Sequence, residues 1–420
     1  MYRVTRLRNG LTVVTAEMPH MASVSVGIWV GVGSRYEPPR LNGVCHFIEH
    51  LLFKGTKRRT ASKISEAVEG IGGYLNAFTS EESTCFHARA CHDRFDALLD
   101  VLMDMLLHSR FDPSDIHKER EVIKEEIAMY LDQPHHQVQE LLNETLWPQQ
   151  PLGRPITGTP RTLDAMTRDD LVGYLRENYV AAGALIVAAG RLKHSAVVRK
   201  VQGYAAGVKT GARAVLPPAR NGQLEPRIRL ATKPAEQSQL AIGIRTCSRH
   251  DERRYALRLL STILGENMSS RLFQVIREDR GLAYSIYSTP SFFADTGDLV
   301  ISVGLDADHL TKTVRLILAE LRRLIDKPPG VAELGRARDY VIGQMDLSLE
   351  NTDNQMNWLG DQWLGYGRLF RPAEIRRSLA SVTPAQVRAA ARDFFRPDRF
   401  NLALVSPLKS ARQITAVFKL

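Results

Sequence analysis

The sequence predicts an α/β protein of two homologous layered domains, each a mixed β-sheet covered by helices. Three observations support this fold class. Short apolar strand patterns alternate with helix patterns along the chain. The 420 residues exceed the usual length of a single domain. Segments of the two halves also resemble each other at one constant spacing, which indicates a duplicated domain.

The repeat sets the predicted domain boundaries. Residues 167–187 and 383–404 both have the pattern of a helix followed by an apolar strand, and the two segments begin 216 residues apart. The same offset places residues 26–28 over residues 242–244. The stretch between the copies is rich in Gly, Ala and Pro and has little periodicity, which is typical of a linker. We therefore expect a first domain, a linker and a second domain at residues 1–205, 206–224 and 225–420.

The individual elements follow from periodicity. Apolar strand patterns are found at residues 11–15, 24–30, 239–245 and 299–303. Helix patterns are found at residues 43–53, from Asp112 onward, at 331–349 and at 354–364. Because the strands are joined both by turns and by helices, the pattern predicts mixed sheets with helices on one side.

A short motif in the first predicted domain carries the chemistry. His46 and His50 are four residues apart, so on a helix they point in the same direction and can bind one metal ion. Glu49 lies beside them, within reach of a water molecule at an open metal position. This H-x-x-E-H pattern is the inverted form of the zinc-protease signature. The surrounding helix is apolar on nearly every side, which indicates burial. A hydrogen-bonded structural cluster is the alternative at this point.

A third ligand is available on the helix that begins at Asp112. Glu119 and Glu126 are seven residues apart and share the apolar stripe of that helix. Two acids on an inward face require a positive partner, which a metal ion would supply. The alternative is an acidic surface helix whose inward face is assigned imprecisely.

Together, the motif and the segment 119–127 (EREVIKEEI) resemble the pitrilysin and mitochondrial processing peptidase family, most closely its short bacterial processing-peptidase-like members. The resemblance implies one Zn²⁺ per chain, bound by His46, His50 and Glu126. It implies that Glu49 is the general base and that Glu119 supports the site from behind the ligands. At the repeat offset the motif positions become Thr262, Gly265 and Glu266, so we expect metal only in the first domain.

The resemblance also implies how substrate binds. Asn76, Ala77 and Phe78 lie in a segment that is similar to the family's substrate-binding edge strand. Arg277 and Tyr284, seven residues apart, resemble a pair that contacts the substrate backbone from the facing domain. Ordinary readings of Arg277 as a solvated helix residue and Tyr284 as a strand residue remain open.

Composition excludes several other classes. Residues 1–210 carry 25 Lys and Arg against 24 Asp and Glu, so most of the net charge of +10 belongs to the second half. The basic residues are scattered and lack interleaved aromatic residues, so we expect no nucleic-acid partner. The longest strongly apolar run, residues 181–190, is about half of a membrane span, and we expect no membrane partner. Four cysteines without a disulfide pattern favour the cytoplasm.

The expected function is that of a zinc-dependent endopeptidase acting on extended, unfolded peptides or presequence-like segments. The alternative is a non-catalytic structural or partner subunit of a related complex. Family members close a chamber with four domain copies, whereas this chain has two. We therefore expect a homodimer, with a heterodimer with a paralogue as the other possibility.

Overall fold

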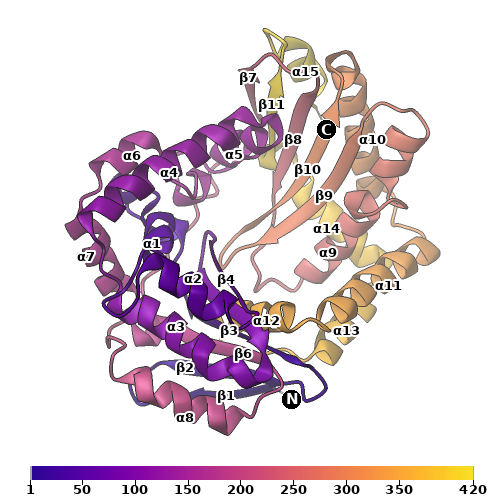
Figure 1. Cartoon of the computed structure of the whole chain (residues 1–420). Helices are drawn as coiled ribbons and strands as arrows, with labels where there is room; N and C mark the ends of the chain where they lie inside the picture. Colours follow the sequence, from indigo (N-terminus) through magenta and orange to yellow (C-terminus); the bar gives the residue numbers. More distant parts are fainter. Residues whose placement is uncertain (1, 420) are drawn as a thin grey trace. The chain divides into compact units, whose positions relative to one another are not determined.

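The computed structural model describes residues 2–419, which form two compact units, each with its own β-sheet and apolar core (Figure 1). The strands are β1 (Tyr2–Arg6), β2 (Thr12–Glu17), β3 (Ser23–Val30), β4 (Tyr74–Thr79), β5 (Thr84–Cys91), β6 (Ala184–Gly190), β7 (Arg227–Thr232), β8 (Ser238–Arg245), β9 (Ser285–Phe292), β10 (Gly297–Leu305) and β11 (Phe400–Ser406). The α-helices are α1 (Val44–Leu52), α2 (Ala61–Glu69), α3 (Phe95–His108), α4 (Pro113–Asp132), α5 (Pro134–Leu146), α6 (Pro160–Ala165), α7 (Arg168–Asn178), α8 (His194–Ala205), α9 (Arg254–Ser261), α10 (Leu310–Asp326), α11 (Val331–Ser348), α12 (Thr352–Tyr366), α13 (Pro372–Ala380), α14 (Pro384–Phe394) and α15 (Arg412–Val417).

The first unit is built on a six-stranded mixed sheet in the order β1-β2-β6-β3-β5-β4. β2 and β6 run parallel, and every other neighbouring pair is antiparallel. Helices α1, α3 and α8 pack against strands of this sheet and share one apolar core with it. β4 is an edge strand, because it pairs only with β5. This open edge becomes important for the site.

The second unit repeats this plan. Its sheet has the order β7-β11-β8-β10-β9, with β7 and β11 parallel and the remaining pairs antiparallel. The order matches that of the first sheet without β1, and α14 begins 216 residues after α7. The predicted fold class of two homologous mixed-sheet domains is therefore confirmed.

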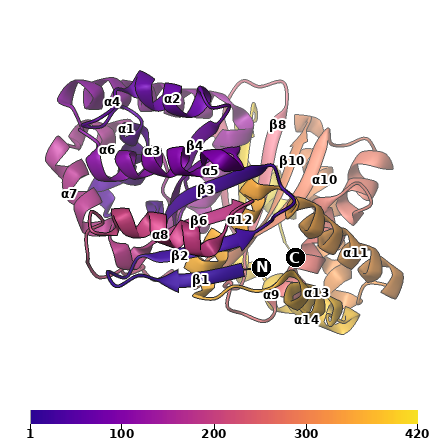
Figure 2. The same cartoon turned by 60° about the horizontal axis from the view of Figure 1, so that its bottom comes forward.

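Each unit takes one helix from the other half of the sequence. The first unit consists of residues 1–128, 154–217 and 347–369, and the second of residues 129–153, 218–346 and 370–420. Thus α12 packs on β2, β3 and β6, whereas α5 packs on β7, β8 and β11. Figures 1 and 2 show α12 beside the strands of the first unit. The predicted boundaries treated each domain as one continuous stretch, and the compact units are discontinuous.

These two helices, α5 and α12, are called the exchanged helices, and each covers the second face of the sheet on which it packs. Met356 and Leu359 of α12 are fully buried against a cluster that includes Val14 and Val187, which point away from the main core. Leu142 of α5 is buried in a corresponding cluster in the second unit. The expectation of helices on one side only was wrong, because central strands such as β6 are apolar on both faces and both faces require cover.

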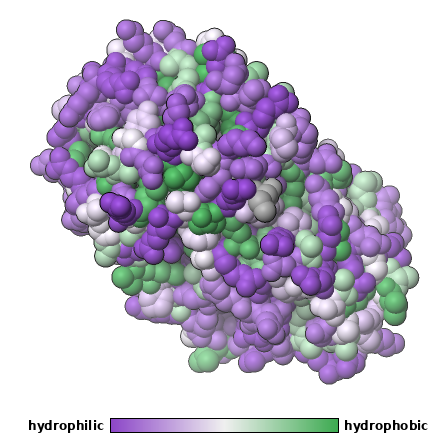
Figure 3. All heavy atoms as spheres, turned by 90° about the horizontal axis from the view of Figure 1, so that it is seen from below, coloured by the Kyte–Doolittle hydropathy of each residue, from purple (hydrophilic) through white to green (hydrophobic). Residues whose placement is uncertain are grey.

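The predicted elements themselves are present. Each of the four strand patterns lies within or overlaps a strand, and the helix patterns correspond to α1, α4, α11 and α12. Residues 206–226, between α8 and β7, contain neither helix nor strand. Within residues 2–419, no helix is both long and apolar enough to cross a membrane. The face seen in Figure 3 is mostly hydrophilic, with apolar residues scattered across it.

Candidate metal centre

Helix α1 presents the motif on its one accessible side. Phe47, Ile48 and Leu51 are buried in the core of the first unit, whereas His46, Glu49 and His50 are partly exposed. The helix begins after Gly43, whose φ of 95° favours glycine. A Cβ there would lie 2.7 Å from the Thr157 carbonyl oxygen. The start of α1 is therefore held against neighbouring backbone.

The buried carboxylate of Glu37 holds the N-terminus of α1. One oxygen accepts hydrogen bonds from the backbone N–H of Gly43 at 2.7 Å and from the Asn42 amide at 3.1 Å. The other accepts from the backbone N–H of Cys45 at 2.9 Å. A negative group at this end satisfies free N–H donors and complements the helix dipole. The role of Glu37 was not foreseen from the sequence, because a capping residue that is separated from its helix by a loop has no fixed spacing.

Helix α4 supplies the two predicted acids. Ile116, Ile123 and Ile127 are buried and anchor one face of the helix in the core. Glu119 is on this face with only 5% exposure, and Glu126 is partly buried. The alternative of an acidic surface helix therefore does not describe Glu119.

The structure brings His46, His50 and Glu126 together. Oε2 of Glu126 lies 3.7 Å from Nε2 of His46 and 3.6 Å from Nε2 of His50. The three candidate ligand atoms all lie within 4.8 Å of one another. Two ligands of a tetrahedral zinc ion are separated by about 3.3 Å, given metal–ligand bonds of about 2.0–2.1 Å. Two nitrogen donors and one carboxylate, with both carboxylate–nitrogen distances close to that spacing, fit a catalytic zinc site with one position left open.

The two histidines have different protonation behaviour. Burial, reinforced by the nearby charge of His50, lowers the pKa of His46 to about 4. Burial also acts to lower the pKa of His50, but hydrogen bonds with Glu119 and Glu126 outweigh it and raise this pKa to about 9. At neutral pH, His46 is therefore uncharged and His50 is protonated, so His50 would have to release a proton to coordinate a metal ion.

Glu119 orients His50. Its Oε2 lies 3.1 Å from Nδ1 of His50, so the other ring nitrogen, Nε2, faces Glu126. Its Oε1 forms an ion pair with Lys54 at 2.9 Å. Although burial acts to raise the pKa of Glu119, the bonds with His50 and Lys54 lower it below its usual value. This carboxylate–histidine arrangement is the usual outer shell of a metal site, and Lys54 is a member that sequence reasoning missed.

Glu49 is held by a residue of the edge strand. The Thr79 hydroxyl donates a hydrogen bond of 2.6 Å to Oε2 of Glu49. Burial raises the pKa of Glu49, and the Thr79 bond partly offsets this effect. A raised pKa makes a carboxylate a better proton acceptor near neutral pH. Thr79 was not singled out from the sequence, because its contact with Glu49 depends on how β4 packs on α1.

The predicted substrate strand residues Asn76, Ala77 and Phe78 lie in β4, on the open edge of the first sheet. The backbone N–H of Ala77 donates to Oδ1 of Asn76 at 2.9 Å. The Asn76 amide in turn donates to the Tyr74 hydroxyl at 2.7 Å. This backbone donor of the edge strand is thus bonded to the side chain of an exposed residue, Asn76.

Arg277 and Tyr284 belong to the second unit and lie close to each other. The Arg277 guanidinium carbon lies 5.9 Å from the centre of the Tyr284 ring and 4.8 Å from that of Phe273. The Tyr284 side chain is largely solvent-accessible, with 73% exposure for the residue. Because the Tyr284 ring is exposed beside an arginine, it is available for contacts with another molecule.

The second unit has no counterpart of the metal cluster among its described residues. At the offset positions, Glu266 forms an ion pair with Arg258 and accepts a hydrogen bond of 2.7 Å from the Thr262 hydroxyl. Here the helix is π-helical from Thr262 to Glu266, and Gly265 departs from helical dihedrals. The glutamate at the position that matches His50 is therefore paired with an arginine of its own unit.

Two protein families match this chain in succession. Residues 12–160 match the family described as Insulinase (Peptidase family M16), and residues 165–341 match the one described as Peptidase M16 inactive domain. The first match contains the cluster of His46, His50 and Glu126, and the second contains Arg277 and Tyr284.

Full-length relatives and solved structures agree with these matches. An uncharacterized zinc protease of Streptomyces coelicolor is 40% identical over 97% of this chain and 90% of its own length. The uncharacterized zinc protease YmxG of Bacillus subtilis is 37% identical over 95% and 97%, respectively. A protease from Helicobacter pylori has the same fold, with a TM-score of 0.91, 21% identity and coverage of 97% of this chain and 99% of its own. The M16 inactive-domain structure from Pseudomonas fluorescens has a TM-score of 0.90 at 18% identity, with the same coverage.

Proposed function

This chain belongs to the insulinase family, peptidase family M16, and from that premise we propose that it is a zinc endopeptidase whose ligands are His46, His50 and Glu126. Family membership makes the chain a metalloprotease. The proposal adds the ligand set, a stoichiometry of about one zinc per chain and the roles of individual residues. The observation that carries it is the convergence of two histidine nitrogens and one carboxylate oxygen within 4.8 Å, beside Glu49.

The proposed mechanism assigns the proton transfers to Glu49. Zinc bound at this site would acidify a water molecule and polarise the peptide carbonyl. The Thr79 hydroxyl occupies Oε2 of Glu49, which leaves Oε1 to accept the proton of the attacking water. Glu49 then returns this proton to the leaving nitrogen. Glu119 and Lys54 keep His50 in one orientation throughout.

We propose that substrate binds as an added strand on β4. The edge offers backbone groups for pairing, and the Ala77 N–H becomes available when the Asn76 side chain rotates away. Because Thr79 ends β4 and bonds to Glu49, a peptide paired along Asn76, Ala77 and Phe78 is led toward the general base. Pairing through the backbone favours extended, unfolded peptides and tolerates many side chains.

We also propose that the active form is a homodimer in which Arg277 and Tyr284 of one chain serve the zinc site of the other. The proposal is supported by the exposure of Tyr284 and by the presence of both residue sets in one chain. A paralogue of similar sequence in place of one copy would preserve the same geometry. The four free cysteines support a reducing compartment such as the cytoplasm.

The test is zinc content and peptidase activity, measured side by side on purified variants with a quenched-fluorescent peptide of mixed sequence. Wild type should hold about one zinc per chain and cleave. Glu49→Gln should keep its zinc and lose activity by about 10²-fold or more, the usual effect of removing a general base. Glu126→Gln should lose both zinc and activity.

Glu125→Gln is the matched control, because Glu125 is the exposed neighbour of Glu126 on the same helix. It should retain zinc and activity. Wild type without zinc, or Glu126→Gln with normal zinc, would refute the ligand assignment. Zinc without cleavage in wild type would favour the alternative of a non-catalytic or partner-dependent subunit.

A further inference from the structure

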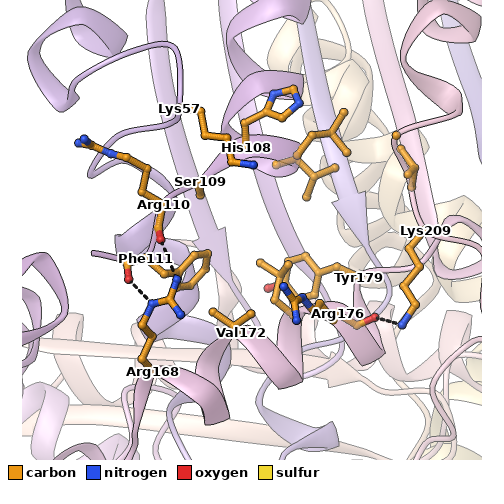
Figure 4. Close-up of a pocket in the computed structure, with 15 residues that line it drawn as sticks. Lys57, His108, Ser109, Arg110, Phe111, Arg168, Val172, Arg176, Tyr179 and Lys209 are labelled. Carbon is orange, nitrogen blue, oxygen red and sulfur yellow. Dashed lines mark hydrogen bonds between the residues drawn. The ribbon is translucent and has the colours of Figure 1, made fainter. Parts of the chain in front are cut away.

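The first unit contains a pocket that is separate from the metal cluster. A pocket of about 460 Å³ lies between the end of α3, the exposed part of α7 and the segment that follows α8 (Figure 4). Its lining shares no residue with the metal cluster. The volume is in the range of sites that take small molecules, which is about 300–1,000 Å³.

Cations from four separate segments surround this pocket. They are Lys57, Arg110, Arg168, Arg176 and Lys209. All five residues are exposed at the mouth of the pocket. Figure 4 shows Arg110 and Arg168 on one side of it, Lys209 on the other and Arg176 between them. No Asp or Glu contributes to the lining.

Within residues 2–419, these cations are not held in ion pairs. Among the described residues, none of the five forms an ion pair with a carboxylate. Arg168 donates to the carbonyl oxygens of Phe111 and Arg110 at 2.8 and 3.3 Å, and Lys209 donates to that of Arg176 at 3.1 Å. The half-buried Asp112, the residue after Phe111, accepts hydrogen bonds from Ser114, and these bonds, with the nearby charges of Arg110 and Arg168, lower its pKa.

A general excess of positive charge does not explain the cluster. Residues 1–210, which supply the whole lining, carry 25 Lys and Arg against 24 Asp and Glu. Five cations around one pocket, with only the Asp112 carboxylate close to two of them, therefore stand out from a nearly neutral half of the chain. Such an arrangement attracts anions and concentrates their field in a concave site.

The floor of the pocket is apolar. It is formed by buried or half-buried side chains, including Phe111, Val172, Leu175 and Val208. We propose that this pocket binds a phosphate-bearing small molecule with an apolar or aromatic body, as in a nucleotide. The phosphates pair with the cations at the mouth, and the body covers the floor. The proposal does not depend on the peptidase mechanism.

The test measures binding of inorganic triphosphate and of ATP to the zinc-loaded protein by isothermal titration calorimetry. Zinc content is determined before and after each titration, so that metal extraction is not scored as binding. The variant is a triple substitution, Lys57→Gln, Arg110→Gln and Arg176→Gln, because these side chains make no hydrogen bond or ion pair that the fold would lose. The matched control, Arg8→Gln, Lys63→Gln and Arg199→Gln, removes the same charge from exposed positions elsewhere in this unit.

Wild type should bind one ATP per chain, and more tightly than triphosphate, because only ATP covers the floor. The pocket variant should bind both about tenfold or more weakly, a difference of about 1.4 kcal/mol or more. The control triple should bind as wild type does. Equal weakening in the two triples, or no binding to wild type, would overturn the site. Equal affinity of wild type for ATP and triphosphate would overturn the role of the floor.

Discussion

At the residue scale, one cluster contains three glutamates that have the same side chain but different contacts. Glu126 faces both histidines, Glu119 lies between His50 and Lys54, and Glu49 is held by Thr79. These contacts explain why the pKa values of Glu119 and Glu49 shift in opposite directions. The carboxylate with two cationic neighbours stays ionised, whereas burial raises the pKa of the one whose partner is a hydroxyl.

The role of Glu119 can be tested without changing a ligand. Glu119→Gln keeps the shape of the side chain but removes the charge that pairs with His50 and Lys54. We expect zinc affinity to fall by about 10–100-fold, the usual cost of losing such a supporting group. Competition with a fluorescent zinc chelator measures this change. Glu121→Gln, an exposed position on the same helix, serves as the control, and an unchanged affinity in Glu119→Gln would contradict the assignment.

At the scale of elements, caps and exchanged helices determine where the site is built. Glu37 closes the start of α1, while α7 begins with a capping box between Thr167 and Asp170. Both devices satisfy backbone donors that a helix start leaves free. Helices α5 and α12 then cover the sheet faces that the local helices leave open.

The capping box of α7 predicts a pH dependence. Hydrogen bonds from Thr167, together with the Arg40 ion pair, lower the pKa of Asp170 to about 2, below its unfolded value of 3.8. The stabilisation is therefore complete above pH 3.8 and is lost as the pH falls through about 2. Asp170→Asn should lower the free energy of unfolding at neutral pH by about 1 kcal/mol.

The difference between wild type and Asp170→Asn should stay constant down to about pH 4 and shrink as the pH falls from about 4 to about 2, because protons then bind Asp170 more readily in the unfolded chain than in the folded one. Urea unfolding at several pH values measures it. Asp169→Asn, the exposed neighbour, should show neither the loss nor the pH dependence. A constant difference across this pH range would show that ionisation of Asp170 is not the cause.

The helix exchange predicts that core substitutions act in the opposite half of the chain. Leu359→Ala in α12 should speed amide hydrogen exchange in β2, β3 and β6, whereas Leu142→Ala in α5 should speed it in β7, β8 and β11. Each substitution leaves a cavity that costs about 2–5 kcal/mol. Hydrogen exchange with mass spectrometry resolves the two sets of strands. The two variants control for each other, and effects confined to the half that contains the substitution would contradict the exchange.

At the scale of the whole molecule, duplication has left two units of one plan with different chemistry. The first unit holds the metal cluster, and at the matching positions of the second an arginine pairs with Glu266. The second unit instead presents Arg277 and Tyr284 together. The proposed homodimer would bring the two sets of residues, the metal cluster of one chain and Arg277 and Tyr284 of the other, to one substrate.

Subunit complementation tests this sharing. Glu49→Gln lacks the general base, and Arg277→Ala lacks the arginine, so each should be inactive or nearly so alone. In a mixed dimer whose sites are shared between chains, one of the two sites has both groups intact. Equal mixing after dissociation should therefore restore about a quarter of wild-type activity, since half of the dimers are mixed. Light scattering confirms the dimer, and a mixture that remains inactive would contradict shared sites.

Much of this architecture was predictable because it rests on local physics. The spacing of His46 and His50 follows from the helical period, and the apolar stripe of α4 placed Glu119 and Glu126 on one face. Strand patterns and a constant repeat offset predicted two sheets of similar plan, which the strand orders confirm. These features depend only on neighbours within a few turns of the chain or on comparison of the chain with itself.

Tertiary structure alone decided which distant groups meet. A helix with an apolar face requires cover, but its sequence does not say which sheet supplies it, so the exchange of α5 and α12 was not foreseen. The contacts of Lys54, Thr79 and Glu37 also join segments separated by loops. The five cations around the pocket come from four such segments. Periodicity determines the direction of a side chain within its own element, whereas packing between elements determines what it faces.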